Sequence, residues 1–134
     1  VRPVEGYGTT ELSPLAAVNI PPSRAPRGFP ANCKAGTVGQ PVPGVCAKIL
    51  DPDTGAELGP NQSGLLWIGG ANVMRGYWKK PELTEPVLKD GWYCTGDMAQ
   101  LDDEGYIKIT GRLSRFSKIG GEMVPHGAVE EALL

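Results

Sequence analysis

The stretch YCTGDMAQLDDEGYIKITGRLSRFSKIGGEMVP, residues 93–125, determines which fold and which function this chain predicts. Two strand-like runs, MAQLD and YIKIT, flank the turn sequence DEG (103–105), an arrangement typical of a β-hairpin. TGD (95–97) precedes the first predicted strand, and GR (111–112) follows the second. We therefore expect a carboxylate and a guanidinium at neighbouring strand ends, arranged around a small polar ligand.

The same stretch continues into a second predicted hairpin and a helix. Strand-like residues flank the glycine pair 120–121, which is typical of a two-residue turn. HGAVEEALL (126–134) has the spacing of an amphipathic helix, with Val129, Ala132 and Leu133 on one face. The sequence stops within this helix and starts without a Met, so we expect both ends to be cut from a longer chain.

Upstream of this stretch the pattern predicts a β-rich domain. Residues 45–51 and 64–70 are short strand-like runs, and residues 81–88 predict one short helix. Residues 19–36 contain four Pro and form a predicted long loop, and loops of this length in compact domains are functional or mobile. The 19 Gly and 13 Pro of the chain lie between the apolar runs, as turn residues do.

Composition argues against several classes of function. The 134 residues suit one modest domain, and no apolar run approaches the ~20 residues that cross a membrane. The net charge of -2 gives no sign of a nucleic-acid or anionic-membrane partner. The three Cys are scattered, which argues against a disulfide framework or a zinc site and favours a reducing compartment, the cytoplasm.

The first candidate site is YGTTE, residues 7–11. Tyr7 offers a flat face on which a base can stack. The carboxylate of Glu11 is the kind of ligand that Mg²⁺ takes, while hydroxyls such as that of Thr10 can meet phosphate oxygens. A turn that contains a buried tyrosine explains the same residues without a ligand.

The second candidate site pairs Asp97 with Arg112. A fixed Asp at a strand end can accept hydrogen bonds from both hydroxyls of a ribose, and a guanidinium can reach the same ribose or a phosphate. An Asp turn and a solvated basic loop are the alternative explanations. We expect His126 to begin the final helix rather than to catalyse, and we expect the three tryptophans to pack rather than to hold a ligand: Trp67, Trp78 and Trp92.

Six motifs follow one another in a fixed order along the chain: GYGTTE, GTVGQPVPG, GLLWIGG, VMRGYW, DGWYCTGD and GRLSRFSKIGGEMV. Together they resemble the acyl-adenylate-forming (AMP-binding) superfamily, which includes acyl-CoA synthetases, luciferases and peptide-synthetase adenylation domains. The resemblance covers nearly the whole chain. The last motif is most similar to the acyl-acyl-carrier-protein synthetase part of bifunctional 2-acylglycerophosphoethanolamine acyltransferase/acyl-acyl-carrier-protein synthetases.

The resemblance implies a fragment of an AMP-forming acid–thiol ligase. In that family a carboxylate, here a fatty acid, attacks the α-phosphate of ATP to give acyl-AMP and pyrophosphate. A phosphopantetheine thiol then takes the acyl group. The implied cofactors are ATP and Mg²⁺. The last motif favours acyl carrier protein as the acceptor, and a fatty acyl-CoA synthetase, with coenzyme A as the acceptor, is the alternative.

Site residues follow from the same resemblance. Tyr7 is implied to lie against adenine. Thr10 is implied to contact the α-phosphate and Glu11 to bind Mg²⁺, which makes these two the catalytic candidates. Asp97 is implied to hold the ribose hydroxyls with help from Arg112. The small polar ligand expected at the strand ends is then the ribose of ATP or acyl-AMP.

Two further positions match parts of the family that move. Ser114 aligns with the hinge about which the C-terminal domain swings, although the family usually has Asp or Lys there. Gly121 aligns with a hairpin that approaches the pantetheine tunnel, where the absence of a side chain lets the backbone come close.

The implied fold is α+β and mostly β. Residues 1–35 are expected to be the end of the large α/β subdomain with a Pro-rich loop. Residues 36–112 are expected to form a distorted antiparallel β-barrel subdomain. Residues 113–134 are expected to hold the hinge and the start of the mobile C-terminal domain.

Two parts of the family's machinery have no counterpart in this sequence, namely the phosphate-binding loop and the catalytic Lys. Because electrostatic stabilisation is usually the largest contribution to catalysis, we expect the isolated chain to be inactive. A stand-alone nucleotide-binding module without catalysis is the competing hypothesis. The length of the native gene product distinguishes the two.

Overall fold

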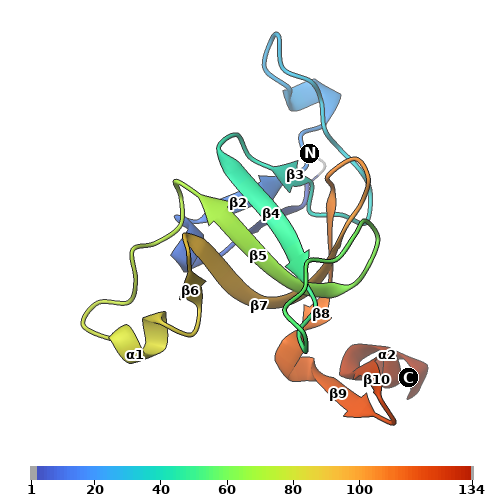
Figure 1. Ribbon diagram of the computed structural model, residues 1–134. Coiled ribbons are helices and arrows are strands. Elements are labelled where there is room, and N and C mark those ends of the chain that lie inside the picture. Colours follow the sequence, from blue (N-terminus) through green and yellow to red (C-terminus); the bar gives the residue numbers. More distant parts are fainter. Residues whose placement is uncertain (1–2, 134) are drawn as a thin grey trace.

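The computed structural model describes residues 3–133, apart from the side chains at positions 116, 123, 125 and 128. The described residues form ten short strands and two helices, so the prediction of an α+β, mostly β chain is confirmed (Figure 1). No helix of the described part is long and apolar enough to cross a membrane.

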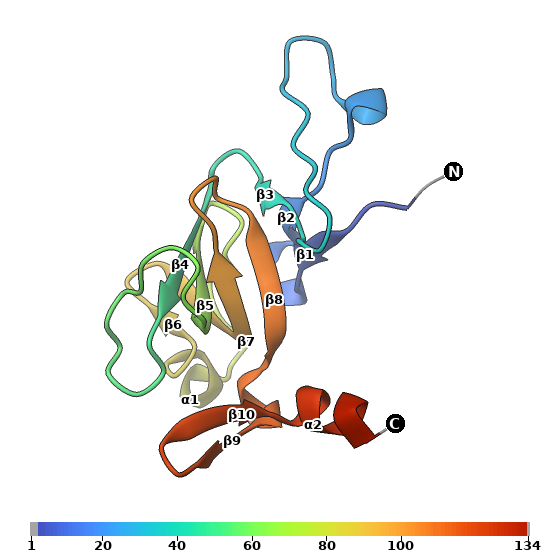
Figure 2. The same cartoon turned by 90° about the vertical axis from the view of Figure 1, so that its right-hand side faces the viewer.

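The larger sheet is antiparallel and is organised around the ten-residue strand β7 (Trp92–Leu101). One edge of β7 pairs with β5 (Gly64–Gly70), which pairs in turn with β4 (Val45–Leu50). The other edge pairs with β6 (Leu88–Lys89) near its start and with β8 (Ile107–Arg112) near its end. The sheet curls around the core as a result (Figures 1 and 2). The strands predicted at 45–51 and 64–70 are confirmed.

The predicted hairpin between β7 and β8 is also confirmed, and its turn shows why the sequence favours it. Asp102 Oδ1 accepts hydrogen bonds from the backbone N–H groups of Glu104 (3.0 Å) and Tyr106 (2.9 Å). Gly105 has φ +82°, a conformation that glycine adopts without strain. The side chain of Asp102 therefore organises the turn that follows it.

The TGD motif differs from its predicted position, because it lies inside β7 rather than before a strand. Residues 95–97 lie opposite Leu66 alone, so the strand bulges at this point. The buried Thr95 hydroxyl donates to the Leu66 carbonyl (2.9 Å), and Gly96 has φ +74°. The bulge thus redirects the chain at the residue before Asp97.

A smaller sheet carries the N-terminal motif. It consists of β1 (Gly6–Gly8), β2 (Leu15–Val18) and β3 (Gln40–Pro41), with a 3-10 turn at Thr10–Leu12 between β1 and β2. Backbone hydrogen bonds join this part to the larger sheet, from Val38 N–H to Ile107 O (2.8 Å) and from Ile107 N–H to Gly39 O (2.9 Å).

One hydrophobic core lies between the two sheets. Its side chains come from the 3-10 turn and β2 on one side and from the larger sheet on the other. The largest fully buried side chains are those of Leu12, Ile49, Leu66, Ile68 and Ile107. Since both sheets contribute to the same core, neither buries its apolar face alone.

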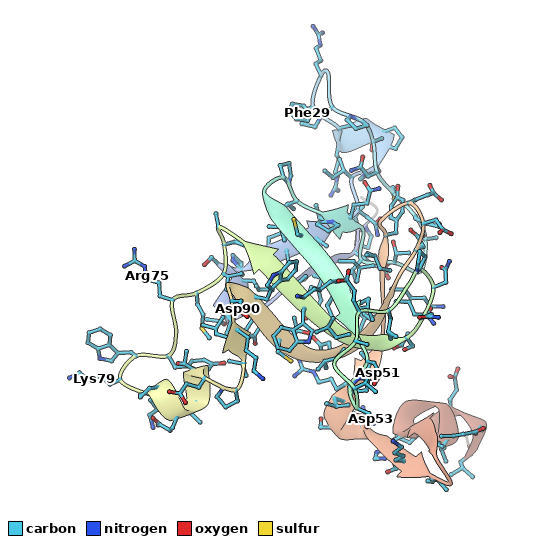
Figure 3. All side chains as sticks on the ribbon, in the orientation of Figure 1. Phe29, Asp51, Asp53, Arg75, Lys79 and Asp90 are labelled. Atoms are coloured by element: carbon cyan, nitrogen blue, oxygen red, sulfur yellow. The ribbon has the colours of Figure 1, made fainter. Side chains whose placement is uncertain are left out.

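Two long loops project from this body. Residues 19–36 form the predicted long loop, which contains a 3-10 turn at Pro22–Arg24 and carries Phe29 at its far end (Figure 3). The other loop, residues 71–80, follows β5, and its Arg75 and Lys79 point away from the sheets (Figure 3).

The short helix predicted over residues 81–88 is shorter in the structure. Helix α1 spans Pro81–Thr84, because Pro86 offers no N–H to extend it and Leu88 already pairs with β7. The prediction that all three tryptophans pack is wrong for Trp78, which is 85% exposed on the preceding loop. Trp92 does pack, with its ring against Gly69 and Lys48 Nζ 4.1 Å from the ring centre.

The C-terminal segment forms the predicted hairpin and helix. A 3-10 turn (Leu113–Arg115) leads from β8 into β9 (Phe116–Ile119), β10 (Glu122–Pro125) and α2 (His126–Leu133). His126 begins α2 as expected, and its Nε2 lies 2.6 Å from Ser117 Oγ. Figure 2 shows this unit below the sheets, beyond the Arg112 end of β8.

Candidate functional site

The structure brings together three residues that lie far apart in the sequence. Asp97 and Arg112 are paired across β7 and β8, and Arg112 Nε lies 3.0 Å from Asp97 Oδ1. The Tyr7 hydroxyl, on β1, donates to Asp97 Oδ2 at 2.5 Å. Asp97 is almost fully buried, whereas the Arg112 side chain is mostly exposed. The carboxylate and the guanidinium expected around a small polar ligand therefore contact each other directly in this structure.

The carboxylate of Asp97 has hydrogen-bonding capacity that the described residues leave unused. Each oxygen of an ionised carboxylate can accept about two hydrogen bonds, and one donor from this chain is assigned to each oxygen. Burial, together with the hydrogen bond to Asp97, raises the pKa of Tyr7 far above its ordinary value, so Tyr7 acts as a neutral donor. A vicinal pair of hydroxyls is the kind of ligand that would use the remaining positions.

A second carboxylate lies on the 3-10 turn between β1 and β2. The Tyr77 hydroxyl donates to Glu11 Oε1 at 2.7 Å, and this hydrogen bond lowers the pKa of Glu11 below its usual range. Thr10, predicted to face the α-phosphate, is exposed on the same turn. The neighbouring Thr9 Oγ1 is buried and has no hydrogen-bond partner among the described residues.

Tyr93 lies near both carboxylate–tyrosine pairs. It is buried on β7, close to Tyr7 and to the Glu11–Tyr77 pair. Burial, and after it the negative charge of Glu11, raises the pKa of Tyr93. Both carboxylate–tyrosine pairs therefore lie beside the same buried tyrosine of β7.

The residues present fit a Mg²⁺ ion shared with phosphate, and they do not fit a metal cage made by protein alone. No group of three Asp, Glu, His or Cys side chains in the described part of the chain could hold a metal. Mg²⁺ in nucleotide sites is commonly held by one or two carboxylates together with phosphate oxygens and water. Glu11 is the carboxylate that could take this role, since Tyr77 is bonded only to its Oε1.

The structure does not bring the two remaining predicted residues into these contacts. Ser114 is exposed in the 3-10 turn after β8. Gly121 lies in the β9–β10 turn with φ +93°, and a Cβ there would meet nothing within 4 Å. Their roles as hinge and tunnel residues stay predictions.

Sequence reasoning missed Tyr77, whereas the hydroxyl of Thr9 belongs to the YGTTE motif that it singled out. The signal for Tyr77 is the VMRGYW motif, whose spacing alone assigns no role to its tyrosine. Because 66 residues separate Tyr77 from Glu11, only the folded structure reveals their hydrogen bond.

Solved structures share this arrangement of strands. The fold matches ATP-bound MatB from Rhodopseudomonas palustris with a TM-score of 0.77 and 34% identity, over 96% of this chain and 24% of that one. It matches O-succinylbenzoate coenzyme A synthetase (MenE) from Bacillus subtilis, in complex with AMP, with a TM-score of 0.77 and 30% identity, over 98% and 25%. The chain thus has the fold of a subdomain of adenylate-forming enzymes.

Residues 1–78 match the family described as AMP-binding enzyme, and the chain belongs to that family. A long-chain-fatty-acid–CoA ligase from Escherichia coli O157:H7 is 36% identical over 131 residues. These residues are 98% of this chain and 22% of that relative, so the chain spans about a fifth of the length of the curated relative it matches.

Proposed function

We propose that this chain is part of an ATP-dependent ligase that activates a fatty acid as acyl-AMP and passes the acyl group to a thiol. In the first step a carboxylate oxygen attacks the α-phosphorus, the bond to the bridging oxygen breaks, and pyrophosphate leaves. In the second step a thiolate attacks the acyl carbonyl, and AMP leaves. Membership of the AMP-binding family supports the reaction class, and the name of the E. coli relative supports the substrate class.

The observation that carries the proposal is the convergence of Tyr7 and Arg112 on the buried Asp97. We propose that Asp97 accepts the ribose hydroxyls, with Arg112 beside them and the Tyr7 ring near adenine. Thr10 and Glu11 lie on the adjacent turn, where we propose that they meet the α-phosphate and Mg²⁺. When bound, the ion would neutralise charge on the phosphates.

The acceptor is a phosphopantetheine thiol, for which two sources have support. Coenzyme A is supported by the name of the E. coli relative. Acyl carrier protein is supported by the resemblance of GRLSRFSKIGGEMV to acyl-acyl-carrier-protein synthetases. Transfer of a radiolabelled acyl group to coenzyme A or to holo acyl carrier protein, offered separately, distinguishes them.

The division of the chain into residues 1–35, 36–112 and 113–134 is part of the same proposal. We propose that Ser114 is the hinge of a C-terminal domain and that Gly121 approaches the pantetheine. The support is the exposed turn at Leu113–Arg115, which joins β8 to a separate hairpin and helix.

The first test is ATP–pyrophosphate exchange by the full-length product of the native gene. The assay offers carboxylates from acetate to long-chain fatty acids, with the 134-residue chain, expected to be inactive, as a control. Exchange with one chain-length class supports the proposal. If the full-length protein shows no exchange with any of these carboxylates but still binds AMP, the result would instead favour a nucleotide-binding module without catalysis.

The same assay tests the role of Asp97. Asp97→Asn keeps the shape of the side chain but removes the charge that strengthens hydrogen bonds from ribose. A lost hydrogen bond to a charged group corresponds to roughly a 10- to 100-fold loss of affinity, so we expect the KM for ATP to rise by that factor. The matched control is Asp90→Asn, on the exposed turn between β6 and β7. An unchanged KM in Asp97→Asn would contradict the proposed role.

A further inference from the structure

The loop that contains VMRGYW, residues 71–80, is hydrogen-bonded to the turn that carries Thr10 and Glu11. The backbone N–H of Met74 donates to the Glu11 carbonyl at 2.8 Å. The Asn72 amide donates to the carbonyls of Leu12 (3.0 Å) and Leu15 (3.2 Å). Asn72 and Met74 therefore hold backbone carbonyls of this turn and of the start of β2.

Tyr77, on the same loop, contacts the side-chain carboxylate of Glu11 rather than the backbone of the turn. Its hydroxyl donates to Glu11 Oε1 at 2.7 Å. Its own backbone N–H donates to Thr84 Oγ1 on α1 at 2.9 Å, so the backbone that carries the ring is anchored independently of Glu11. Gly76 has φ +144°, and a Cβ there would lie 2.9 Å from the Thr84 methyl carbon, which leaves only glycine room for this approach.

We propose that Tyr77 is a positioning residue for Glu11. By holding Oε1, the hydroxyl fixes the rotamer of a long side chain and leaves the second oxygen as the one that a cation can take. Without the hydrogen bond, Glu11 would have to become ordered when the ion binds. This inference rests on the proposed role of Glu11 toward Mg²⁺–ATP, and it assigns to the VMRGYW motif a role in binding that ion.

If Tyr77 only packs, its ring matters and its hydroxyl does not. Removal of the hydroxyl alone would then leave ATP and Mg²⁺ binding unchanged. Tyr77→Phe keeps the ring and its contacts and removes only the donor to Glu11. The matched control is Tyr106→Phe, because no hydrogen bond of the Tyr106 hydroxyl is found within residues 3–133. The Tyr106 ring lies elsewhere, with Lys34 Nζ 5.3 Å from its centre.

The test measures ATP binding by calorimetry on the full-length protein, with and without Mg²⁺, alongside the Mg²⁺ dependence of pyrophosphate exchange. Loss of a residue that orients a metal ligand typically weakens metal binding about 10- to 100-fold. We expect Tyr77→Phe to weaken Mg²⁺-dependent ATP binding and to raise the Mg²⁺ concentration for half-maximal exchange by that factor. We expect metal-free ATP binding, and the rate at saturating Mg²⁺, to stay within about twofold of wild type.

Three outcomes are distinguishable. Equal Mg²⁺ dependence in wild type and Tyr77→Phe, while Glu11→Gln is impaired, would overturn the role of Tyr77 and leave that of Glu11 intact. Wild-type Mg²⁺ dependence in Glu11→Gln would overturn both. A loss of ATP binding that is the same with and without Mg²⁺, or is shared by Tyr106→Phe, would indicate a structural effect and would contradict positioning.

Discussion

At the scale of single residues, two side chains that are distant in the sequence contact the carboxylate of Asp97, namely those of Tyr7 and Arg112. The sequence places Asp97 before one predicted strand and Arg112 after the next, around a small polar ligand, and in the structure the two side chains are paired directly. The hydrogen bond from Tyr7 to Asp97 joins two sheets and residues 90 positions apart, so no local sequence pattern predicts it. Motif spacing therefore proposes the members of the site, whereas the hydrogen bonds among them follow only from the fold.

The hydrogen bond from Tyr7 gives a pH dependence that can be measured. Burial and Asp97 raise the pKa of Tyr7, so the folded chain keeps this proton at a pH where the unfolded chain loses it. Stability from Tyr7 is therefore complete below the unfolded pKa of about 10 and is lost as the pH rises above it. In Tyr7→Phe the free energy of unfolding should fall less steeply above that pH, by up to about 1.4 kcal/mol per pH unit.

Urea unfolding of both proteins at a series of pH values, from about 8 upward, measures this difference against the unfolded pKa of about 10. The values near pH 8 supply the offset between the two proteins, since neither state has lost the Tyr7 proton there. Parallel pH profiles above that range would show that Tyr7 is not held as a neutral donor.

At the scale of elements, strands were predicted well and interruptions of strands were not. Residues 64–70 form β5 as expected, because an apolar run bounded by glycine has few alternatives. The sequence places the TGD motif before a strand, with an Asp turn as the alternative, since a glycine between two polar residues has the same composition at a strand end, in a turn and in a bulge. Only the partner strand, which places Leu66 opposite residues 95–97, distinguishes them.

Two glycines with similar backbones should respond differently to substitution. Gly39 (φ +89°) and Gly36 (φ +76°) both adopt the left-handed region, so Ala at either position pays a similar conformational penalty. A Cβ on Gly39 would lie 2.1 Å from the backbone of Val18, whereas one on Gly36 would meet nothing within 4 Å. We expect Gly39→Ala to destabilise the fold by about 1–3 kcal/mol more than Gly36→Ala.

Denaturant unfolding of the two variants measures that difference in the free energy of unfolding. The conformational penalty is similar in both variants and therefore cancels in the comparison. Equal losses of stability would mean that β2 and the segment before β3 are not packed backbone against backbone.

At the scale of the whole molecule, the two sheets depend on each other through Ile107. Its backbone bonds to residues 38 and 39, and its fully buried side chain lies in the shared core. Hydrophobic patterning predicted β8 but could not show that a residue at its start joins two sheets. Ile107 joins the sheets because residues 36–41 run beside it. The composition of this segment predicts turns but not the path that it takes.

Ile107→Ala should therefore destabilise the whole body in one step. Truncation of a buried Ile costs about 2–5 kcal/mol, and both sheets should lose stability together because they share the core. The matched control is Ile119→Ala on β9, where the side chain is 64% exposed and we expect a change within about 0.5 kcal/mol. Separate unfolding transitions for the two sheets, seen by tryptophan fluorescence and hydrogen exchange, would contradict this coupling.

The C-terminal hairpin and helix are attached differently. A short 3-10 turn connects them to β8, and the exposed Lys118 Nζ lies 2.5 Å from Asp53 Oδ2 in the turn after β4 (Figure 3). A group on a short tether meets its partner at an effective concentration in the millimolar range, so even a weak contact is made for part of the time. Dissolved salt competes with such an exposed pair without disturbing the buried core. Ionic strength would then set how often the hairpin rests against the body, while the body itself keeps the same stability.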